Sequence, residues 1–372
     1  MKASLRIGKI AGVEIGLDYS WFIIFFLVTW SLAAYNFPNS HPGWPATLYW
    51  ILGVFTSILF FGSVLAHEMA HSLVARSTGV PVRNITLFIF GGAAHLSREP
   101  RSARDEFLMA LAGPATSLGI GAVFGLSYFA VRTVSEPLAA LTGWLSAINF
   151  ILALFNLIPG FPLDGGRVLR AIIWAVSRNL KTATQIATII GRAIAFLFIF
   201  AGIWMIFKGN WPNGLWTAFI GWFLENAASS SYRQLALKDM LQGHTAKEIM
   251  NTDCPSVSKT LTLVQLVHDY ILPTTRRCFP VVDGGSISGI ITLHNVKEIP
   301  KEMWSTTSVA DAMIPAGRMI TVKPDDGLFE VFEQLTSEDV NQLPVLENGN
   351  VVGMVARDTV LAFIRAKTEL GI

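Results

Sequence analysis

The feature that most constrains this chain is a series of long apolar runs confined to residues 1–230. A helix that crosses the hydrocarbon core of a bilayer needs about 20 apolar residues. Six segments approach that length, and the last contains Glu225 and Asn226. They lie near residues 20–36, 48–75, 107–131, 137–158, 183–207 and 213–232. The sequence therefore predicts a polytopic α-helical membrane protein with six transmembrane helices, embedded in a lipid bilayer.

The distribution of charge predicts a soluble half after these spans. Charged residues make up 15% of the chain, against roughly 25% in a soluble domain, and they become ordinary in frequency from about residue 238 onward. The net charge of +2 is too small to indicate a nucleic-acid partner. The first twenty residues lack the apolar segment and cleavage site of a signal peptide. Cys254 and Cys278 are too few for a disulfide framework or a spaced zinc site.

The charges of the loops predict an orientation in the cell membrane. If the spans alternate, fourteen Lys and Arg residues fall on one side of the bilayer, and two, Arg132 and Lys208, fall on the other. Lys and Arg accumulate in cytoplasmic loops. We therefore expect both termini and the soluble half to be cytoplasmic.

A possible metal site lies in the second span, at His67-Glu68-Met69-Ala70-His71. Residues four apart lie on one face of a helix, so both imidazoles can reach one ion, and Glu68 can hydrogen-bond a metal-bound water. Ionisable groups inside a span are unfavourable unless something compensates them. A metal ion would do so, although a buried polar cluster or proton relay without metal remains an alternative.

A catalytic zinc site usually has three protein ligands, and Asp164 is the candidate for the third. It follows two prolines that break the fourth span, within residues 156–166. His71 lies five residues before Arg76, at the predicted cytoplasmic end of its span, and Asp164 is expected to emerge at the same level. The alternative is that Asp164 caps the helix that follows.

These motifs resemble the site-2 protease family of intramembrane zinc metalloproteases over residues 1–230. They are H-E-x-x-H at 67–71, N-x-x-P-x-x-P-x-D-G at 156–165, and Phe90-Gly91-Gly92-Ala93 followed by Ala112-Gly113-Pro114. The resemblance implies that His67, His71 and Asp164 bind one Zn²⁺ per chain and that Glu68 is the catalytic base. It also implies that Asn156 positions substrate or polarises the scissile carbonyl, against the alternative of a simple hydrogen bond at a helix end.

Two positions depart from the family pattern. Asp18 stands where many relatives have histidine, and Ser117 stands where many have asparagine. We expect neither residue to touch the predicted metal ligands. Residues 82–94 alternate partly and predict a strand-like segment, which could either pair with an extended substrate or form a structural hairpin.

The soluble half contains an internal repeat with an offset of 63 to 65 residues. Phe279-Pro280-Val281-Val282 matches Leu343-Pro344-Val345-Leu346, and Gly289-Ile290-Ile291 matches Gly353-Met354-Val355. The repeat resembles a tandem pair of cystathionine-β-synthase (CBS) domains, an α/β module. We therefore expect a membrane protease domain at 1–232, a linker at 233–243, and CBS domains at 244–302 and 303–372.

The ligand of this CBS pair is left open by the sequence. Such modules often bind adenine nucleotides through an aspartate that contacts the ribose. Asn295 and Thr359 occupy the expected positions, and Asp358 is one place off. The resemblance therefore implies nucleotide binding or, alternatively, a module for docking or for homodimerisation.

Three functions remain at this point. The first is a protease that hydrolyses a peptide bond in or near a transmembrane segment of a membrane-protein substrate, modulated by the CBS pair. The second is a CBS-gated metal transporter or channel, which does not explain Glu68 or the Pro-x-Asp-Gly segment at matching depth. The third is an inactive scaffold, which the intact set of candidate ligands opposes.

Overall fold

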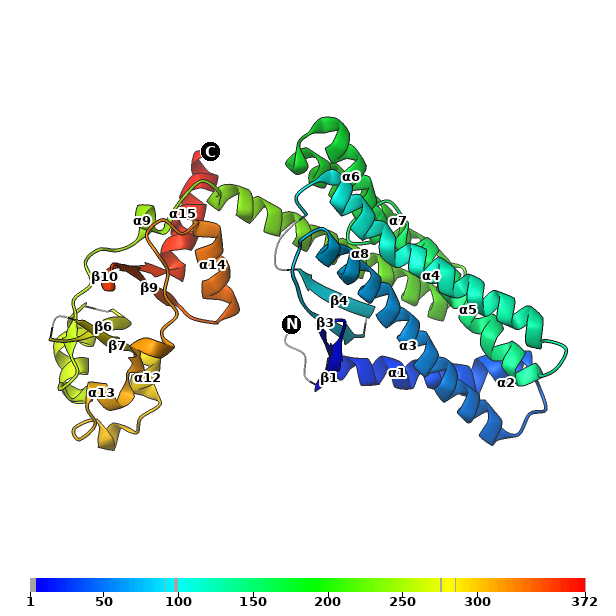
Figure 1. Cartoon of the computed structure of the whole chain (residues 1–372), viewed down its shortest axis with the longest axis horizontal. Helices are drawn as coiled ribbons and strands as arrows, with labels where there is room; N and C mark the ends of the chain where they lie inside the picture. Colours follow the sequence, from blue (N-terminus) through cyan, green and yellow to red (C-terminus); the bar gives the residue numbers. More distant parts are fainter. Residues whose placement is uncertain (1–4, 90, 97–99, 275, 285, 372) are drawn as a thin grey trace. The chain divides into compact units, whose positions relative to one another are not determined.

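The computed structural model describes residues 5–89, 91–96, 100–274, 276–284 and 286–371. The chain divides into two compact units, Met1–Arg233 and Gln234–Ile372. The first contains long helices and a small sheet, and the second is an α/β module (Figure 1).

Long helices dominate the first unit, as the apolar runs predicted. They are α1 (Tyr19–Ser31), a π-helical turn (Leu32–Asn36), α2 (Phe37–Ser40), α3 (Ala46–Ser77), α4 (Ala103–Val131), α5 (Glu136–Asn156), α6 (Asp164–Ser177), α7 (Leu180–Phe207) and α8 (Trp211–Leu241). Among the described residues, five segments are long and apolar enough to cross a membrane: Tyr19–Ser40, α3, α4, α5 and α7. The sixth predicted span falls within the longer helix α8.

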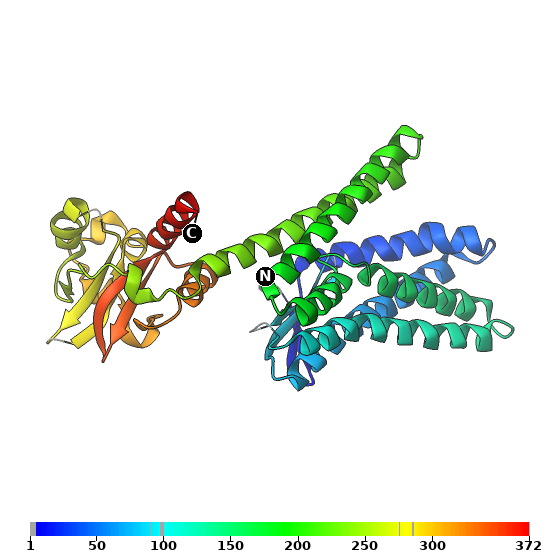
Figure 2. The same ribbon diagram turned by 90° about the horizontal axis from the view of Figure 1, so that it is seen from above.

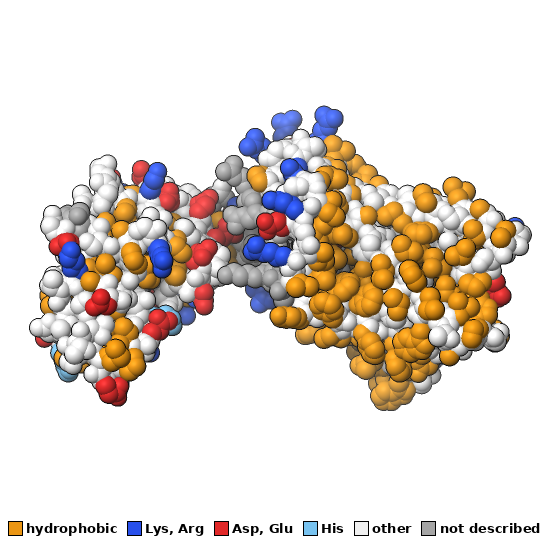
Figure 3. Space-filling model, turned by 60° about the horizontal axis from the view of Figure 1, so that its bottom comes forward, with side chains coloured by type: hydrophobic (Ala, Val, Ile, Leu, Met, Phe, Trp, Pro, Cys, Tyr) orange, Lys and Arg blue, Asp and Glu red, His pale blue; other side chains and the backbone are white. Residues whose placement is uncertain are grey.

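The outer surface of these helices is apolar. Leu126, Ile189, Leu197 and Phe200 are each exposed by about two thirds or more of their surface. Figure 3 shows hydrophobic side chains over most of the visible face of this unit, with Lys and Arg gathered toward one end. An apolar surface of this extent is unfavourable in water and favourable against lipid.

A four-stranded sheet packs against the helix that carries the two histidines. Its order is β1 (Leu5–Ile10), β2 (Val13–Leu17), β3 (Val82–Phe88) and β4 (Gly91–Leu96). Strands β2 and β3 are parallel, and the other neighbours are antiparallel. Val13, Ile15 and Ile85 of the sheet bury Met69 of α3. The extended segment predicted after the second span therefore forms a hairpin of β3 and β4. Because β4 is the last strand of the described sheet, the hairpin is also compatible with pairing to an extended substrate.

The second unit consists of two interlocked repeats. Its strands are β5 (Val257–Ser258), β6 (Cys278–Asp283), β7 (Ser286–Thr292), β8 (Ile314–Pro315), β9 (Gln342–Glu347) and β10 (Asn350–Ala356). Its longer helices are α14 (Leu328–Ser337) and α15 (Arg357–Leu370), and short turns include α9 (Ala246–Ile249), α12 (Leu293–Lys297) and α13 (Val309–Ala312).

Each repeat contributes its first extended residues to the other repeat. Asn251 bridges to Met354 of β10, and Ile314 of β8 pairs with Ile290 of β7. The positions 251 and 314, and likewise 290 and 354, differ by about one repeat length. This exchange explains why the two halves form one unit, because neither repeat completes its sheet alone.

Candidate metal centre and family

The two prolines and two glycines after the fourth span produce a sharp break between helices. Helix α5 ends at Asn156, and α6 begins at Asp164. A Cβ on Gly165 would lie 2.3 Å from the carbonyl oxygen of Leu157, and a Cβ on Gly166 would meet the backbone of Gly160 at 2.3 Å. Only glycine allows the start of α6 to fold so closely onto the loop before it.

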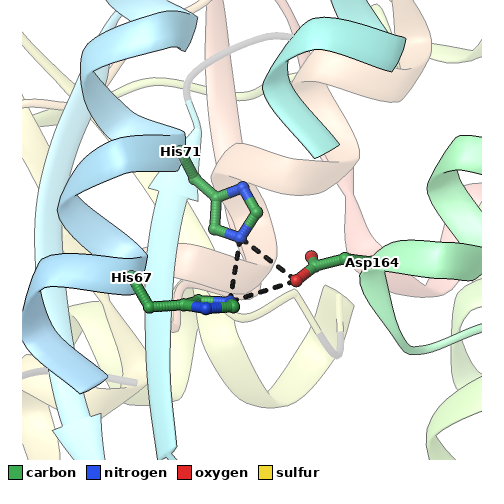
Figure 4. A group of neighbouring side chains, drawn as sticks. All are labelled: His67, His71 and Asp164. Atoms are coloured by element: carbon green, nitrogen blue, oxygen red, sulfur yellow. Dashed lines mark hydrogen bonds and ion pairs between the residues drawn. The ribbon is translucent and has the colours of Figure 1, made fainter. Parts of the chain in front are cut away.

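Asp164 is directed at the two histidines. Leu163 occupies the N-cap position of α6, so the capping alternative is wrong. The Oδ2 atom of Asp164 lies 3.1 Å from Nε2 of His67 and 3.2 Å from Nε2 of His71. The two Nε2 atoms are 3.2 Å apart. Figure 4 shows the three side chains pointing to one another from α3 and α6. The structure thus brings together the three side chains that the sequence predicts as ligands, although Asp164 lies 97 positions after His67.

The hydrogen bonds behind these side chains indicate what they can hold. Nδ1 of His71 donates to the carbonyl oxygen of Met109 at 2.6 Å. In the neutral ring the proton is then on Nδ1, and the lone pair of Nε2 faces the carboxylate oxygen of Asp164. The lone pairs of the two Nε2 atoms and of the Asp164 oxygen would repel one another at these distances. They therefore need a cation between them, either protons or a metal ion. Tetrahedral zinc, with bonds of about 2.0–2.1 Å, separates its ligand atoms by about 3.3 Å, so the side chains fit zinc.

One face of α4 packs against the residues of the site. Glu106, Met109, Gly113 and Ser117 lie within an arc of about 80° at 3.6 residues per turn. Oγ of Ser117 lies 2.9 Å from Nδ1 of His67. The expectation that Ser117 does not touch a ligand is therefore wrong, because α4 packs across α3 at this level. Asp18, by contrast, caps α1 and bonds Ser20.

Gly113 lets α4 approach the ligand atoms themselves. A Cβ at this position would lie 2.1 Å from Nε2 of His71 and 2.6 Å from Nε2 of His67. Gly113 belongs to the Ala112-Gly113-Pro114 motif, but the sequence does not indicate this contact with the histidines. The polar or small residues Glu106, Gly113 and Ser117, which share one face of an otherwise apolar helix, are the signal that could have indicated this face.

A buried ion pair fixes the helix that carries Asp164. Arg170 of α6 donates through Nε, at 2.6 Å, and through a terminal nitrogen to Oε1 of Glu106, which is fully buried. The guanidinium also lies over the ring of Phe161, 5.1 Å from its centroid. The pair therefore ties α6, and the loop before it, to α4.

The two other predicted site residues lie in different surroundings. Glu68 is half-buried and sits against β4, where a Cβ on Gly92 would be 2.3 Å from its Cγ. Asn156 donates from Nδ2 to the carbonyl oxygen of Leu152 at 3.0 Å. That bond is the helix-end interaction that the sequence left as an alternative. Phe90, part of the third motif, lies outside the described residues.

Comparison with known proteins identifies the family. The model of peptidase family M50 matches residues 55–136 and 131–199, and that of the CBS domain matches 246–302 and 309–366. "Putative zinc metalloprotease Rip3" of Mycobacterium tuberculosis is 33% identical over 368 residues, covering 98% of this chain and 93% of Rip3. The chain belongs to peptidase family M50. Zinc metalloprotease MJ0392 of Methanocaldococcus jannaschii is 29% identical over 375 residues, covering 100% of this chain and 99% of that protein.

Among solved structures, a site-2 protease from Methanocaldococcus jannaschii matches with 27% identity and a TM-score of 0.42, covering 62% of this chain and 95% of that one. Family membership makes this M50 protein a membrane metalloendopeptidase of the site-2 protease type that carries CBS domains. Membership of family M50 therefore favours a peptidase over the alternative of a transporter or channel.

Proposed function

We propose that this M50 peptidase hydrolyses a peptide bond in or near a transmembrane segment of a membrane-protein substrate, as a step of regulated intramembrane proteolysis. One zinc ion per chain is held by His67, His71 and Asp164. The observation that carries the proposal is the convergence of these three ligand atoms within 3.2 Å of one another. Two of the three ligands, His67 and His71, lie on α3, a helix that is otherwise apolar enough to span a membrane, and Asp164 reaches them from the start of α6.

The chemistry follows from the groups around that centre. Bound zinc supplies Lewis acidity, which lowers the pKa of a water toward neutrality and polarises a carbonyl. Glu68, next to a ligand in sequence, accepts the proton of the attacking water and returns it to the leaving amine. Asn156 polarises the scissile carbonyl after it exchanges its bond with Leu152 for one with the substrate.

The edge of the sheet gives the substrate a place to unwind. The backbone of a transmembrane helix hides its peptide groups in internal hydrogen bonds. Strand β4 is the last strand of the described sheet, and Gly92 within it contacts Glu68. An extended substrate segment that pairs with β4 would present its peptide bond beside the base.

The topology of the proposal has six spans, with α8 as the last. Gly202 of α7 packs on the backbone of Ala218 in α8, where an added Cβ would be 2.4 Å away. Such close packing through small residues is typical of membrane helix pairs. Figure 2 shows α7 and α8 as the pair of green helices that runs to the upper right. The loop charges support a cytoplasmic location for both termini and for the CBS domains. The proposed domains are the membrane protease domain at 1–232, the linker at 233–243, and the CBS domains at 244–302 and 303–372. Reporter fusions at the two termini and at Asn210 test this orientation.

The CBS pair is proposed to bind an adenine nucleotide and to form the homodimer. A cavity of about 500 Å³ between the repeats is lined by Arg277, Lys297 and Arg318, which suit phosphate groups. Oδ1 of Asn295 accepts from the backbone N–H and hydroxyl of Thr292, so its oxygen is already used. We therefore expect recognition through phosphates, which calorimetry with ATP and the Arg318→Gln variant tests. Light scattering of the full chain tests the dimer.

The central experiment separates metal binding from catalysis. The full chain is purified in detergent, its zinc is measured, and cleavage of a membrane substrate is compared between wild type and Glu68→Gln. We expect about one zinc in both and a rate lowered by about 10²–10⁴ in the variant. Glu14→Gln, an exposed acid on β2, is the matched control and should remain active.

Two outcomes would contradict the assignment. Full activity in Glu68→Gln would exclude this carboxylate as the base. Zinc retained after His67→Ala combined with Asp164→Ala would exclude the ligand set.

A further inference from the structure

A second polar site lies between α7 and α8, and its lining residues are not those of the metal centre. It is a cavity of about 360 Å³, within the size range of small-molecule sites. Its lining residues are Thr188, Arg192, Glu225, Ser229, Tyr232 and Arg233. Charged side chains inside membrane helices are unfavourable and usually serve a function. None of these residues belongs to the machinery described above.

The cavity combines cationic, anionic and hydroxyl groups. Nε of Arg192 lies 3.2 Å from Oε1 of Glu225, which also accepts from the hydroxyl of Ser229 at 2.7 Å. Thr188 is 3% exposed, and its buried Oγ1 has no hydrogen-bond partner among the described residues. A buried hydroxyl without a partner costs free energy, so a ligand that bonds it would be stabilised.

The position of the cavity along the helices indicates which ligand reaches it. Arg192 lies 15 residues before the end of α7, and Glu225 lies 14 residues after the start of α8. Both are therefore about 21–23 Å from the turn that joins the helices, and Arg233 is about 33 Å from it, at 1.5 Å per residue. In the proposed topology that turn is external, and the hydrocarbon core is about 30 Å thick. The cavity then extends from the inner third of the hydrocarbon core to its cytoplasmic boundary, where phospholipid headgroups lie.

We propose that this cavity binds the headgroup of a zwitterionic aminophospholipid. The phosphate is held by Arg192, Arg233 and the hydroxyl of Thr188, because guanidinium groups and hydroxyls are strong donors to phosphate. The primary ammonium is held by Glu225. Basic pockets between membrane helices on the cytoplasmic side are known to bind lipid headgroups, and the carboxylate adds the discrimination. A lipid with a quaternary ammonium cannot donate to Glu225, and an anionic lipid without an amine offers Glu225 no donor of its own.

The test is native mass spectrometry of the full chain with phosphatidylethanolamine, phosphatidylglycerol and phosphatidylcholine of identical acyl chains. We expect phosphatidylethanolamine to bind about tenfold more tightly than the other two. Arg233→Gln should weaken it about tenfold, and Thr188→Val about fivefold. Glu225→Gln should remove the preference for phosphatidylethanolamine over phosphatidylglycerol. Arg104→Gln, an exposed arginine outside the cavity, should change nothing.

Several results would overturn the proposal. They are equal binding of the three lipids, a preference for phosphatidylglycerol in the wild type, unchanged binding in both Thr188→Val and Arg233→Gln, or displacement by millimolar inorganic phosphate. Zinc content and thermal unfolding are measured on the same samples, so a variant that fails to fold is recognised. Lipid binding does not require the zinc site, and the two proposals therefore fail independently.

Discussion

Gly113 provides the sharpest test of the metal centre, because its replacement by alanine adds one methyl group among the ligand atoms. The added Cβ would lie 2.1 Å from Nε2 of His71 and 2.6 Å from Nε2 of His67. Ordinary contacts to carbon are about 3.5 Å or longer, so the ring of His71 or helix α4 must move by about 1.4 Å. A zinc site tolerates deviations of only about 0.2 Å in its metal–ligand distances.

We therefore expect Gly113→Ala to lower the affinity for zinc by more than about 100-fold, a loss beyond that of outer-shell changes. Zinc content after dialysis should fall from about one per chain to below about 0.1, and activity should fall with it. The change does not weaken the helix itself, because alanine favours a helix over glycine by about 1 kcal/mol.

Gly119→Ala is the matched control on the same helix, because a Cβ there meets nothing within 4 Å. It should keep its zinc and its activity. If Gly113→Ala bound one zinc as tightly as the wild type, the close approach of α4 to the ligand nitrogens would be refuted.

Three further predictions concern other parts of the chain. Ser117→Ala removes the hydrogen bond to Nδ1 of His67 and should weaken zinc binding about 10–100-fold, as measured by competition with a chelator. Unchanged affinity would contradict a role of Ser117 in orienting this histidine. Glu106→Gln leaves Arg170 buried without its charge partner and should lower the free energy of unfolding by about 3–5 kcal/mol, with a smaller loss when Arg170 is changed to Gln as well. Burial raises the pKa of Cys278 to about 12, so at pH 8 iodoacetamide should alkylate the partly exposed Cys254 first. Because the unfolded thiol ionises near pH 8.5, Cys278 should lower the stability of its domain as pH rises from about 8.5 toward 12, and Cys278→Ala should remove that dependence.

Much of the site could be predicted because its sequence signals are local. His67 and His71 share a helix face through the four-residue spacing alone. The break before Asp164 follows from prolines that cannot continue a helix and from glycines that tolerate close packing. Loop charges and helix lengths then placed the three ligands at one depth, and the structure brings them within 3.2 Å of one another.

The sequence by itself determined five of the six predicted spans, which among the described residues correspond to segments long and apolar enough to cross a membrane. It also determined the repeat of the soluble half and the residue types of the candidate zinc site. These follow from hydropathy, self-similarity and helical periodicity, which act within one element. Only the tertiary structure decided which residues of α4 surround the ligands. The contact of Ser117 with His67 joins residues 50 positions apart, and the approach of Gly113 depends on how closely two helices pack. Such contacts arise from the packing of whole helices, which no short stretch of sequence specifies.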